Sequence, residues 1–166
     1  MRSAVVILLW FLFQGNTEVS FCAGNPSRVI CRGREKRALL SFRSHVDDPS
    51  NRLSSWTGEE CCVWDRVGCD NITGHVVKLN LRFCWSIPTQ LGNLSNLQHL
   101  DIKGNSLNVE DLEWVGNLTS LQVLDISGVN IRKAANWLEV MNKLPSLSLL
   151  HLSGCGLDTI APLPAC

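Results

Sequence analysis

The stretch LQHLDIKGNSL, residues 97–107, decides the fold of this chain. Its apolar side chains stand at the first position and three, five and ten positions later, at Leu97, Leu100, Ile102 and Leu107. The same frame returns in three other places, as Val76-Leu79-Leu81, Leu121-Leu124-Ile126-Ile131 and Leu147-Leu150-Leu152-Leu157. The copy that starts at Val76 lacks a final apolar residue, because Ser86 occupies that place. The four copies predict four similar units that stack on one another.

The copies start 21, 24 and 26 residues apart, at Val76, Leu97, Leu121 and Leu147. This spacing is typical of a leucine-rich repeat, whose period is roughly 20–29 residues. One repeat cannot bury its own apolar edge, so the copies must share a continuous core. We therefore expect an α/β solenoid: a curved parallel β-sheet of about four strands, with short helices or loops on the convex side. The outer segments 109–116 and 132–143 are expected to form such helices.

The ends and the composition of the chain predict a secreted protein. Arg2 precedes an apolar run from Ala4 to Phe13, and small and polar residues follow as far as Ala23. This arrangement is typical of a secretory signal, and the run is too short for a membrane span of about 20 residues. Eight cysteines in 166 residues indicate an oxidising compartment. We expect a signal peptide at 1–23, an N-terminal cap at 24–75 and repeats at 76–166, with no membrane span in this chain.

The net charge of zero gives no reason to expect a nucleic acid or a strongly charged membrane surface as a partner. Three Asn-x-Ser/Thr sequons fit a secreted surface, at Asn71, Asn93 and Asn117. The last two occupy equivalent places in successive repeats. Each is a predicted glycosylation site, although the asparagines of the latter pair could also be plain turn residues.

Residues 31–75 lack the repeat frame and predict a small lid on the first repeat. Apolar residues at helical spacing predict a helix that ends at Asp47-Asp48-Pro49. A short second helix over 51–56, with Leu53 and Trp56 facing inward, and strands over 63–69 and 76–81 are expected to follow. A lid with so little core needs covalent staples, and a disulfide contributes roughly 2–4 kcal/mol. We pair Cys31 with Cys61 and Cys62 with Cys69, although spacing alone leaves other connectivities open.

The order of these elements resembles the N-terminal cap of plant leucine-rich-repeat receptor-like proteins. The resemblance rests on Cys31, on the run REKRALLSF at 34–42, on CCVWDRVGC at 61–69 and on TGHVVKLNL at 73–81. It implies the same cysteine pairing and an extracellular module that recognises a ligand in plant defence signalling. It also implies a cell-surface location, since full-length relatives are anchored in the plasma membrane by a single span, and a co-receptor kinase as a second partner.

The stretch KAANWL at 133–138 and the stretch NKLPSL at 142–147 resemble a subgroup related to receptors for an ethylene-inducing fungal xylanase. Two features depart from the family pattern. Trp85 replaces the glycine of the usual Gly-x-Ile-Pro stretch, and the chain stops at Cys166 after about four strands. The second departure suggests a truncated member of the family.

The remaining cysteines are expected to be unpaired. The eighth position after each repeat start, which points into the turn, holds Cys84, Asn105, Val129 and Cys155. Cys84 and Cys155 would lie about 14 Å apart at about 4.8 Å per strand, whereas a disulfide needs Cα atoms within about 7 Å. Both are expected to be buried free thiols. Cys22 is expected to leave with the signal peptide, and Cys166 is terminal and without an obvious partner.

No motif for catalysis, for a cofactor or for a metal site occurs in the sequence. The four histidines are scattered, and adjacent Cys61 and Cys62 have the wrong spacing for zinc. Asp101 and Asp125 would face each other about 5 Å apart on neighbouring strands, as paired acids of a glycosidase do. Aspartate is common at this position in plant repeats of this kind, so we expect no enzyme and no cofactor.

Binding is the expected function, through side chains that alternate outward on the concave face. Three columns result: Lys78, His99, Val123 and Leu149; Asn80, Asp101, Asp125 and His151; and Arg82, Lys103, Ser127 and Ser153. All of these except Val123 and Leu149 are the predicted ligand-facing residues, for a protein or a glycan. Imidazoles change charge in the mildly acidic range. Because His99 and His151 lie on this face, we expect the affinity for the ligand to differ between pH 5 and pH 7.5.

Two other functions remain open. The chain could be a soluble wall-space inhibitor of a pathogen polysaccharide-degrading enzyme, since those inhibitors resemble it in cap and repeats but hold many more repeats. It could also be a non-functional truncated fragment, because Leu150, Leu152 and Leu157 would stand uncovered on an open final edge.

Overall fold

In the computed structural model the residues described are 29–82, 89–105 and 108–157. Their helices and strands, in chain order, are α2 (Gly33–Ser44), η1 (Cys61–Val63), β1 (Val67–Cys69), β2 (Val76–Asn80), η2 (Thr89–Asn93), β3 (His99–Asp101), α3 (Glu113–Gly116), β4 (Val123–Asp125), α4 (Trp137–Asn142) and β5 (Leu149–His151). The predicted signal peptide, Cys22, Cys84, Trp85, Ser86, Leu107 and Cys166 lie outside the described residues.

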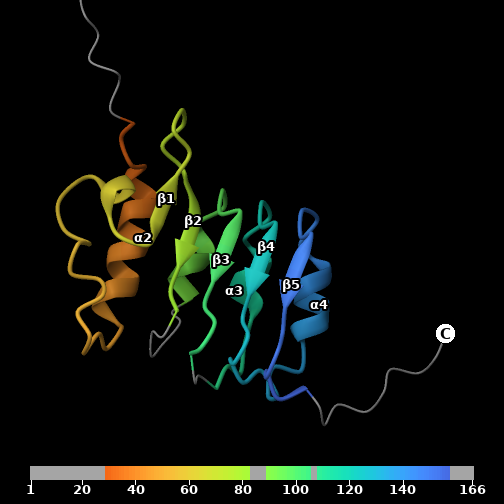
Figure 1. Cartoon of the computed structure of the whole chain (residues 1–166). Coiled ribbons are helices and arrows are strands. Elements are labelled where there is room, and N and C mark those ends of the chain that lie inside the picture. Colours follow the sequence, from red (N-terminus) through yellow and green to blue (C-terminus); the bar gives the residue numbers. More distant parts are fainter. Residues whose placement is uncertain (1–28, 83–88, 106–107, 158–166) are drawn as a thin grey trace, which may run out of the picture.

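The strands form one sheet in the order β1-β2-β3-β4-β5 (Figure 1). Strands β2 to β5 are parallel, and Leu79, Leu100, Leu124 and Leu150 stand opposite one another. The four-stranded parallel ladder predicted from the repeat frame is therefore confirmed. Strand β1 adds a fifth member, which pairs antiparallel with β2. Leu97 and Leu121 are fully buried, and Leu147 is partly buried, each two residues before its strand.

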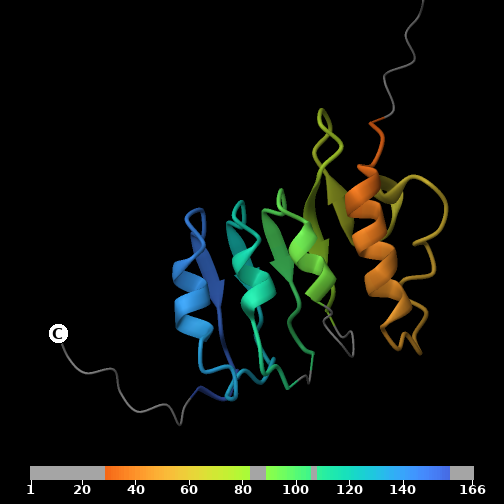
Figure 2. The same ribbon diagram turned by 180° about the vertical axis from the view of Figure 1, so that it is seen from behind.

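The helices η2, α3 and α4 cover one face of this sheet, together with α2 of the cap (Figure 2). The frame leucines point into the space between the two layers, and Leu100, Ile102, Leu124 and Ile126 are at most 1% exposed. Burying one such side chain stabilises the fold by roughly 1.5–3 kcal/mol. The strand residues between the frame leucines face the opposite side of the sheet. The repeat frame therefore determines which residues are exposed on that side.

The turns after β3 and β5 are held by the inward residues that the sequence predicted, Asn105 and Cys155. Asn105 donates its side-chain amide to the backbone oxygens of Leu81, at 2.9 Å, and of Ile102. Cys155 is 1% exposed and unpaired, and its thiol donates to the oxygen of Ile126 at 3.2 Å. The predicted buried free thiol is confirmed at Cys155. Val129 is equally buried but has no donor to offer.

Two expectations about helices are corrected. Residues 51–56 form hydrogen-bonded turns rather than a helix, because the Asp48 carboxylate accepts the backbone N–H groups of Arg52 and Leu53 and because Asn51 has a φ of 52°. Leu53 and Trp56 nevertheless face inward as predicted, at 1% and 0% exposed.

The convex helices are also shorter than the predicted 109–116 and 132–143. The backbone at Asn108 bridges to Asn130 in the next repeat, and the Val109 N–H donates to the Asn130 oxygen at 2.9 Å. The Ile131 N–H similarly donates to the Cys155 oxygen at 3.1 Å. These inter-repeat bonds keep the start of each outer segment extended, so helix begins only at Glu113 and Trp137.

The cap closes the first repeat, with α2 packed against η2. Disulfides join Cys31 to Cys61 and Cys62 to Cys69, each with a Cα–Cα distance of 5.4 Å, so the predicted pairing is confirmed. Trp56 stacks on Trp64 with ring centroids 5.6 Å apart and contacts Phe42 as well. Within the described part of the chain, no helix has the length and apolar character needed to cross a membrane.

Candidate functional site

A shallow hollow of about 230 Å³ lies on the exposed face of the sheet, across strands β2 to β5. Its floor contains the frame residues Leu79 and Leu100, and its walls are Lys78, Asn80, Arg82, His99, Asp101, Val123, Asp125 and His151. The residues in the walls come from positions that alternate with the buried leucines. The same two-residue period that builds the core therefore builds the hollow.

The strand register places the predicted columns side by side. Lys78 pairs with His99, His99 with Val123, and Val123 with Leu149. Asn80, Asp101, Asp125 and His151 form the second row in the same way. The third column lies in the turns beyond the strands, and only Arg82 from it lines the hollow. Lys103, Ser127 and Ser153 stand outside the lining.

The two aspartates of the hollow are held in place by their own repeats and by neighbouring cations. Asp101 accepts a hydrogen bond from Arg82 Nε at 2.6 Å and contacts a second guanidinium nitrogen at 2.5 Å. Its other oxygen accepts the Lys103 N–H at 3.2 Å, and Asp125 accepts the Ser127 N–H at 3.0 Å in the same way. Lys103 Nζ lies 3.9 Å from Asp125. Both carboxylates therefore stabilise the turn that follows their own strand and form ion pairs with basic residues on the exposed face.

These contacts change the pKa values of the groups involved. Burial raises the pKa of the Asp125 carboxyl, but the hydroxyl and N–H of Ser127, followed by the charges of Lys103 and His151, outweigh it, so that this pKa is lowered. The hydrogen bond to Asp101 raises the pKa of Arg82. Both groups are charged at neutral pH, which makes the centre of the hollow a fixed ion-pair network.

Two basic side chains at one wall of the hollow remain available. Lys78 and His99 are exposed, and their side chains make no hydrogen bond or ion pair with residues that the structure describes. His151, on β5, is also exposed, and it is one of the groups that lower the pKa of Asp125. Donor groups without a protein partner, next to an apolar floor, can bind a polar partner without first breaking an internal bond.

The sequence-based list of ligand-facing residues missed Val123. Val123 lines the hollow between His99 and His151, and it adds apolar surface to an otherwise polar wall. Its position in the first column placed it on the exposed face, but only polar and charged residues of that face were predicted to contact the ligand. Leu149, in the same column, is 48% exposed on the next strand. The face is thus polar over β2 and β3 and more apolar over β4 and β5.

The three sequon asparagines lie away from the hollow. Asn71, in the turn between β1 and β2, and Asn93 and Asn117, at the ends of η2 and α3, are all exposed. None of them lines the hollow. Sugars on these residues would leave the concave face open.

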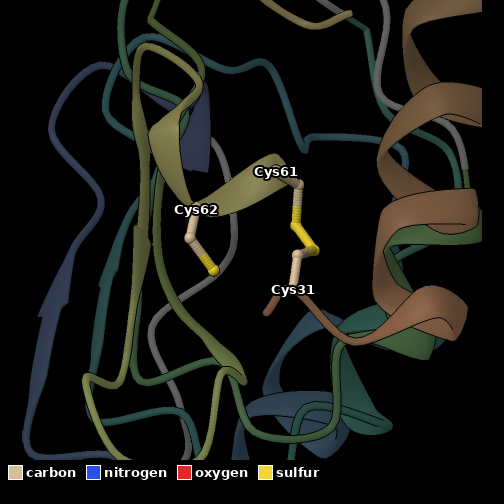
Figure 3. Close-up of side chains that lie close together, drawn as sticks. All are labelled: Cys31, Cys61 and Cys62. Atoms are coloured by element: carbon tan, nitrogen blue, oxygen red, sulfur yellow. A yellow bond between two sulfur atoms is a disulfide. The ribbon is translucent and has the colours of Figure 1, made fainter. Parts of the chain in front are cut away.

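A cluster of three cysteines, Cys31, Cys61 and Cys62, lies in the cap (Figure 3). Their sulfur atoms are all within 4.8 Å of one another. All three belong to disulfides, so they do not offer the thiolates that a metal ion requires.

Comparison with known proteins agrees with this architecture. Residues 32–70 match the family described as "Leucine rich repeat N-terminal domain", and residues 96–118 match "Leucine Rich Repeat". The chain is 30% identical to Receptor-like protein EIX1 of Solanum lycopersicum over 89% of its own length and 21% of the relative. It is 29% identical to Receptor-like protein EIX2 of the same species over 96% of its length and 22% of the relative. The chain thus spans about a fifth of the length of these relatives.

Solved structures show the same fold. A plant ice-binding protein superposes with a TM-score of 0.60 and 25% identity, over 74% of this chain and 40% of that one. The PEPR1–AtPEP1 structure superposes with a TM-score of 0.58 and 26% sequence identity, over 72% of this chain and 18% of that one. A chain of the BIR3–SERK2 complex from Arabidopsis thaliana superposes with a TM-score of 0.57 and 25% sequence identity, over 69% of this chain and 65% of that one.

Proposed function

Because this chain is a leucine-rich-repeat protein related to plant receptor-like proteins, we propose that it is an extracellular ligand-recognition module that acts in plant defence signalling. The ligand binds on the concave face. The observation that carries the proposal is the hollow across β2 to β5, which has an apolar floor. The side chains of Lys78 and His99 beside it have no partner among the described residues. Similarity to the receptor-like proteins EIX1 and EIX2 supports the role as a receptor module.

The size of the hollow argues for a large ligand. Pockets that enclose drug-sized molecules hold about 300–1,000 Å³, and this one holds about 230 Å³. It accepts one side chain or one sugar ring of a partner that spreads over the rest of the face. A protein is the favoured ligand, since Val123 and Leu149 extend the face with exposed apolar surface.

An extracellular location is consistent with the cap. Two disulfides tie a small lid that has little core of its own, and such bonds persist in oxidising compartments. The sequons, the predicted glycosylation sites, are exposed and stand clear of the proposed binding face. We also propose a co-receptor kinase as a second partner, in line with the similarity to plant receptor-like proteins.

The test is to secrete the protein from plant cells and to measure its binding to a fungal xylanase by biolayer interferometry. Xylanase should bind, and the double variant Lys78→Ala/His99→Ala should lower the affinity at least tenfold, which is about 1.4 kcal/mol. Lys133→Ala, which removes a cation outside the hollow, should leave the affinity unchanged. No binding of xylanase would contradict the proposal, and inhibition of a fungal polygalacturonase would favour the inhibitor function.

A further inference from the structure

The two disulfides of the cap are packed closely enough to react with each other. The Cys62 sulfur lies within 4.8 Å of both sulfurs of the Cys31–Cys61 bond (Figure 3). Cys69, the partner of Cys62, is not part of this cluster among the described residues. We propose that the cap is a redox-responsive site, in which reduction of Cys62–Cys69 releases Cys62 to attack the Cys31–Cys61 disulfide and to form Cys31–Cys62.

Exposure decides which disulfide opens first. Cys62 and Cys69 are half-buried, whereas Cys31 is 5% and Cys61 is 0% exposed. Thiol–disulfide exchange requires in-line access of a thiolate to a sulfur atom. An external dithiol therefore reaches the outer bond, Cys62–Cys69, and is screened from the inner one. The inner bond is reached from inside, by Cys62.

The reaction balances in two steps. An external dithiol transfers two electrons to Cys62–Cys69, is itself oxidised to a disulfide, and leaves a Cys62 thiolate and a Cys69 thiol. The Cys62 thiolate then forms a bond to the Cys31 sulfur, and the Cys31–Cys61 bond breaks. The electron pair of that bond leaves on Cys61, which takes up a proton. The second step is an isomerisation and needs no further reductant.

The local structure selects Cys62 as the mobile group and Cys31 as its target. Cys69 is the last residue of β1 and stays paired with Val76 of β2. Cys62 lies in the three-residue 3₁₀ helix η1, which has no side-chain cap. Attack on Cys61 would join adjacent residues in a strained ring, whereas attack on Cys31 closes a long loop. The new Cys31–Cys62 disulfide still links the residues before α2 to η1, so the cap keeps one disulfide.

The test uses the full-length secreted protein and a jump in pH. A phosphine reductant at pH 5 opens the outer disulfide, and the protein is desalted and moved to pH 8 without oxidant. Aliquots are quenched with acid and alkylated. Trypsin then cuts after Arg28, Arg32, Arg52 and Arg66, so that Cys31 lies on one peptide and Cys61 and Cys62 on another. Fragmentation between Cys61 and Cys62 identifies which of them carries the Cys31 peptide.

The expected result is that Cys31 moves from Cys61 to Cys62 after the jump. The thiolate fraction of a thiol that titrates near pH 8.5 rises about tenfold per pH unit below that pH, so exchange at pH 8 should be several-hundredfold to a thousandfold faster than at pH 5. The variant Cys62→Ala should keep Cys31–Cys61 throughout. The reduced wild-type protein held at pH 5 is a second control, which does not depend on the folding of the variant.

Three results would overturn the proposal. In the first, Cys31 remains on Cys61 at pH 8 while Cys62 and Cys69 are alkylated. In the second, Cys31–Cys61 opens at pH 5 before Cys62–Cys69. In the third, fragmentation finds Cys61 joined to Cys62.

Discussion

The Nδ1 atom of His75 lies 2.9 Å from the carboxylate of Glu35, a residue that is only 4% exposed. The second oxygen of Glu35 accepts the backbone N–H of Val76 at 2.8 Å. Glu35 is on α2, and Val76 begins β2. One buried carboxylate therefore joins the cap helix to the first strand of the repeats.

Replacing Glu35 should loosen the cap. Glu35→Ala leaves a buried N–H without an acceptor, which costs about 1–3 kcal/mol, so the free energy of unfolding should fall by about 2–3 kcal/mol in urea titration. Glu35→Gln keeps an acceptor and should cost less. Glu59→Ala, which breaks the exposed pair with Lys36, should change stability by no more than about 0.5 kcal/mol. Equal losses at positions 35 and 59 would contradict this role for Glu35.

Val129→Asn should be tolerated in the core. Val129 stands between Asn105 and Cys155 in the row of turn residues. The Ile102 oxygen accepts the Asn105 amide there, whereas the Ile126 oxygen accepts both the Val129 N–H and the Cys155 thiol. A carbonyl oxygen has two lone pairs, so an amide at 129 can donate to the Ile102 oxygen. We expect the free energy of unfolding to stay equal or to rise by about 1 kcal/mol.

The control for that substitution is Ile126→Asn, two residues beyond the central residue of β4. Ile126 is fully buried among apolar side chains, and an amide in such a place costs about 2–5 kcal/mol through the lost packing and desolvation. Thermal unfolding of both variants provides the measurement. A loss of more than about 2 kcal/mol at Val129→Asn would show that the row does not accept a second donor.

Asp125 should make stability depend on pH in the acid range. Its folded pKa lies below the unfolded value of 3.8, so its contribution is present above that pH and is lost as the pH falls through the folded pKa. Asp125→Asn should cost about 0.5–1 kcal/mol at pH 6 and clearly less near pH 2.5. Urea titrations at the two pH values provide the comparison. The same cost at both would rule out this linkage.

Cys155 should resist thiol reagents in the folded protein. The side chain is 1% exposed, and burial raises the pKa of its thiol. N-Ethylmaleimide should therefore leave it unlabelled in buffer and label it fully in urea, as peptide mapping would show. Labelling in buffer at the rate of an exposed thiol would mean that this last turn opens readily.

Glycosylation is predicted at Asn71, Asn93 and Asn117. All three are exposed, and the Asn93 side chain donates to the Gln90 oxygen at 3.1 Å. Protein secreted from plant cells should lose mass on enzymatic deglycosylation, and Asn→Gln variants should remove the glycopeptides one at a time. Three unmodified peptides would refute this prediction.

The repeat frame was enough to predict the register, because the third and fifth residues after Leu97, Leu121 and Leu147 must turn inward for the stack to close. It also predicted the two rows of the hollow, since the residues between the leucines have only one other face to occupy. The outer helices were overestimated because the bond from Val109 to Asn130 depends on the neighbouring repeat and leaves no local pattern. The ion pair of Arg82 with Asp101 likewise depends on side-chain conformations across two repeats.

The convex layer changes in its type of helix along the chain. The outer segment of the first repeat contains the five-residue 3₁₀ helix η2, and the third contains the six-residue α-helix α4, while β3, β4 and β5 all have three residues. Strands stack about 4.8 Å apart, whereas an α-helix with its side chains is about 10 Å across. Each unit is therefore a wedge, wider on its helical side than on its strand side. Stacking such wedges bends the sheet, which draws the outward side chains of neighbouring strands closer together than their backbones.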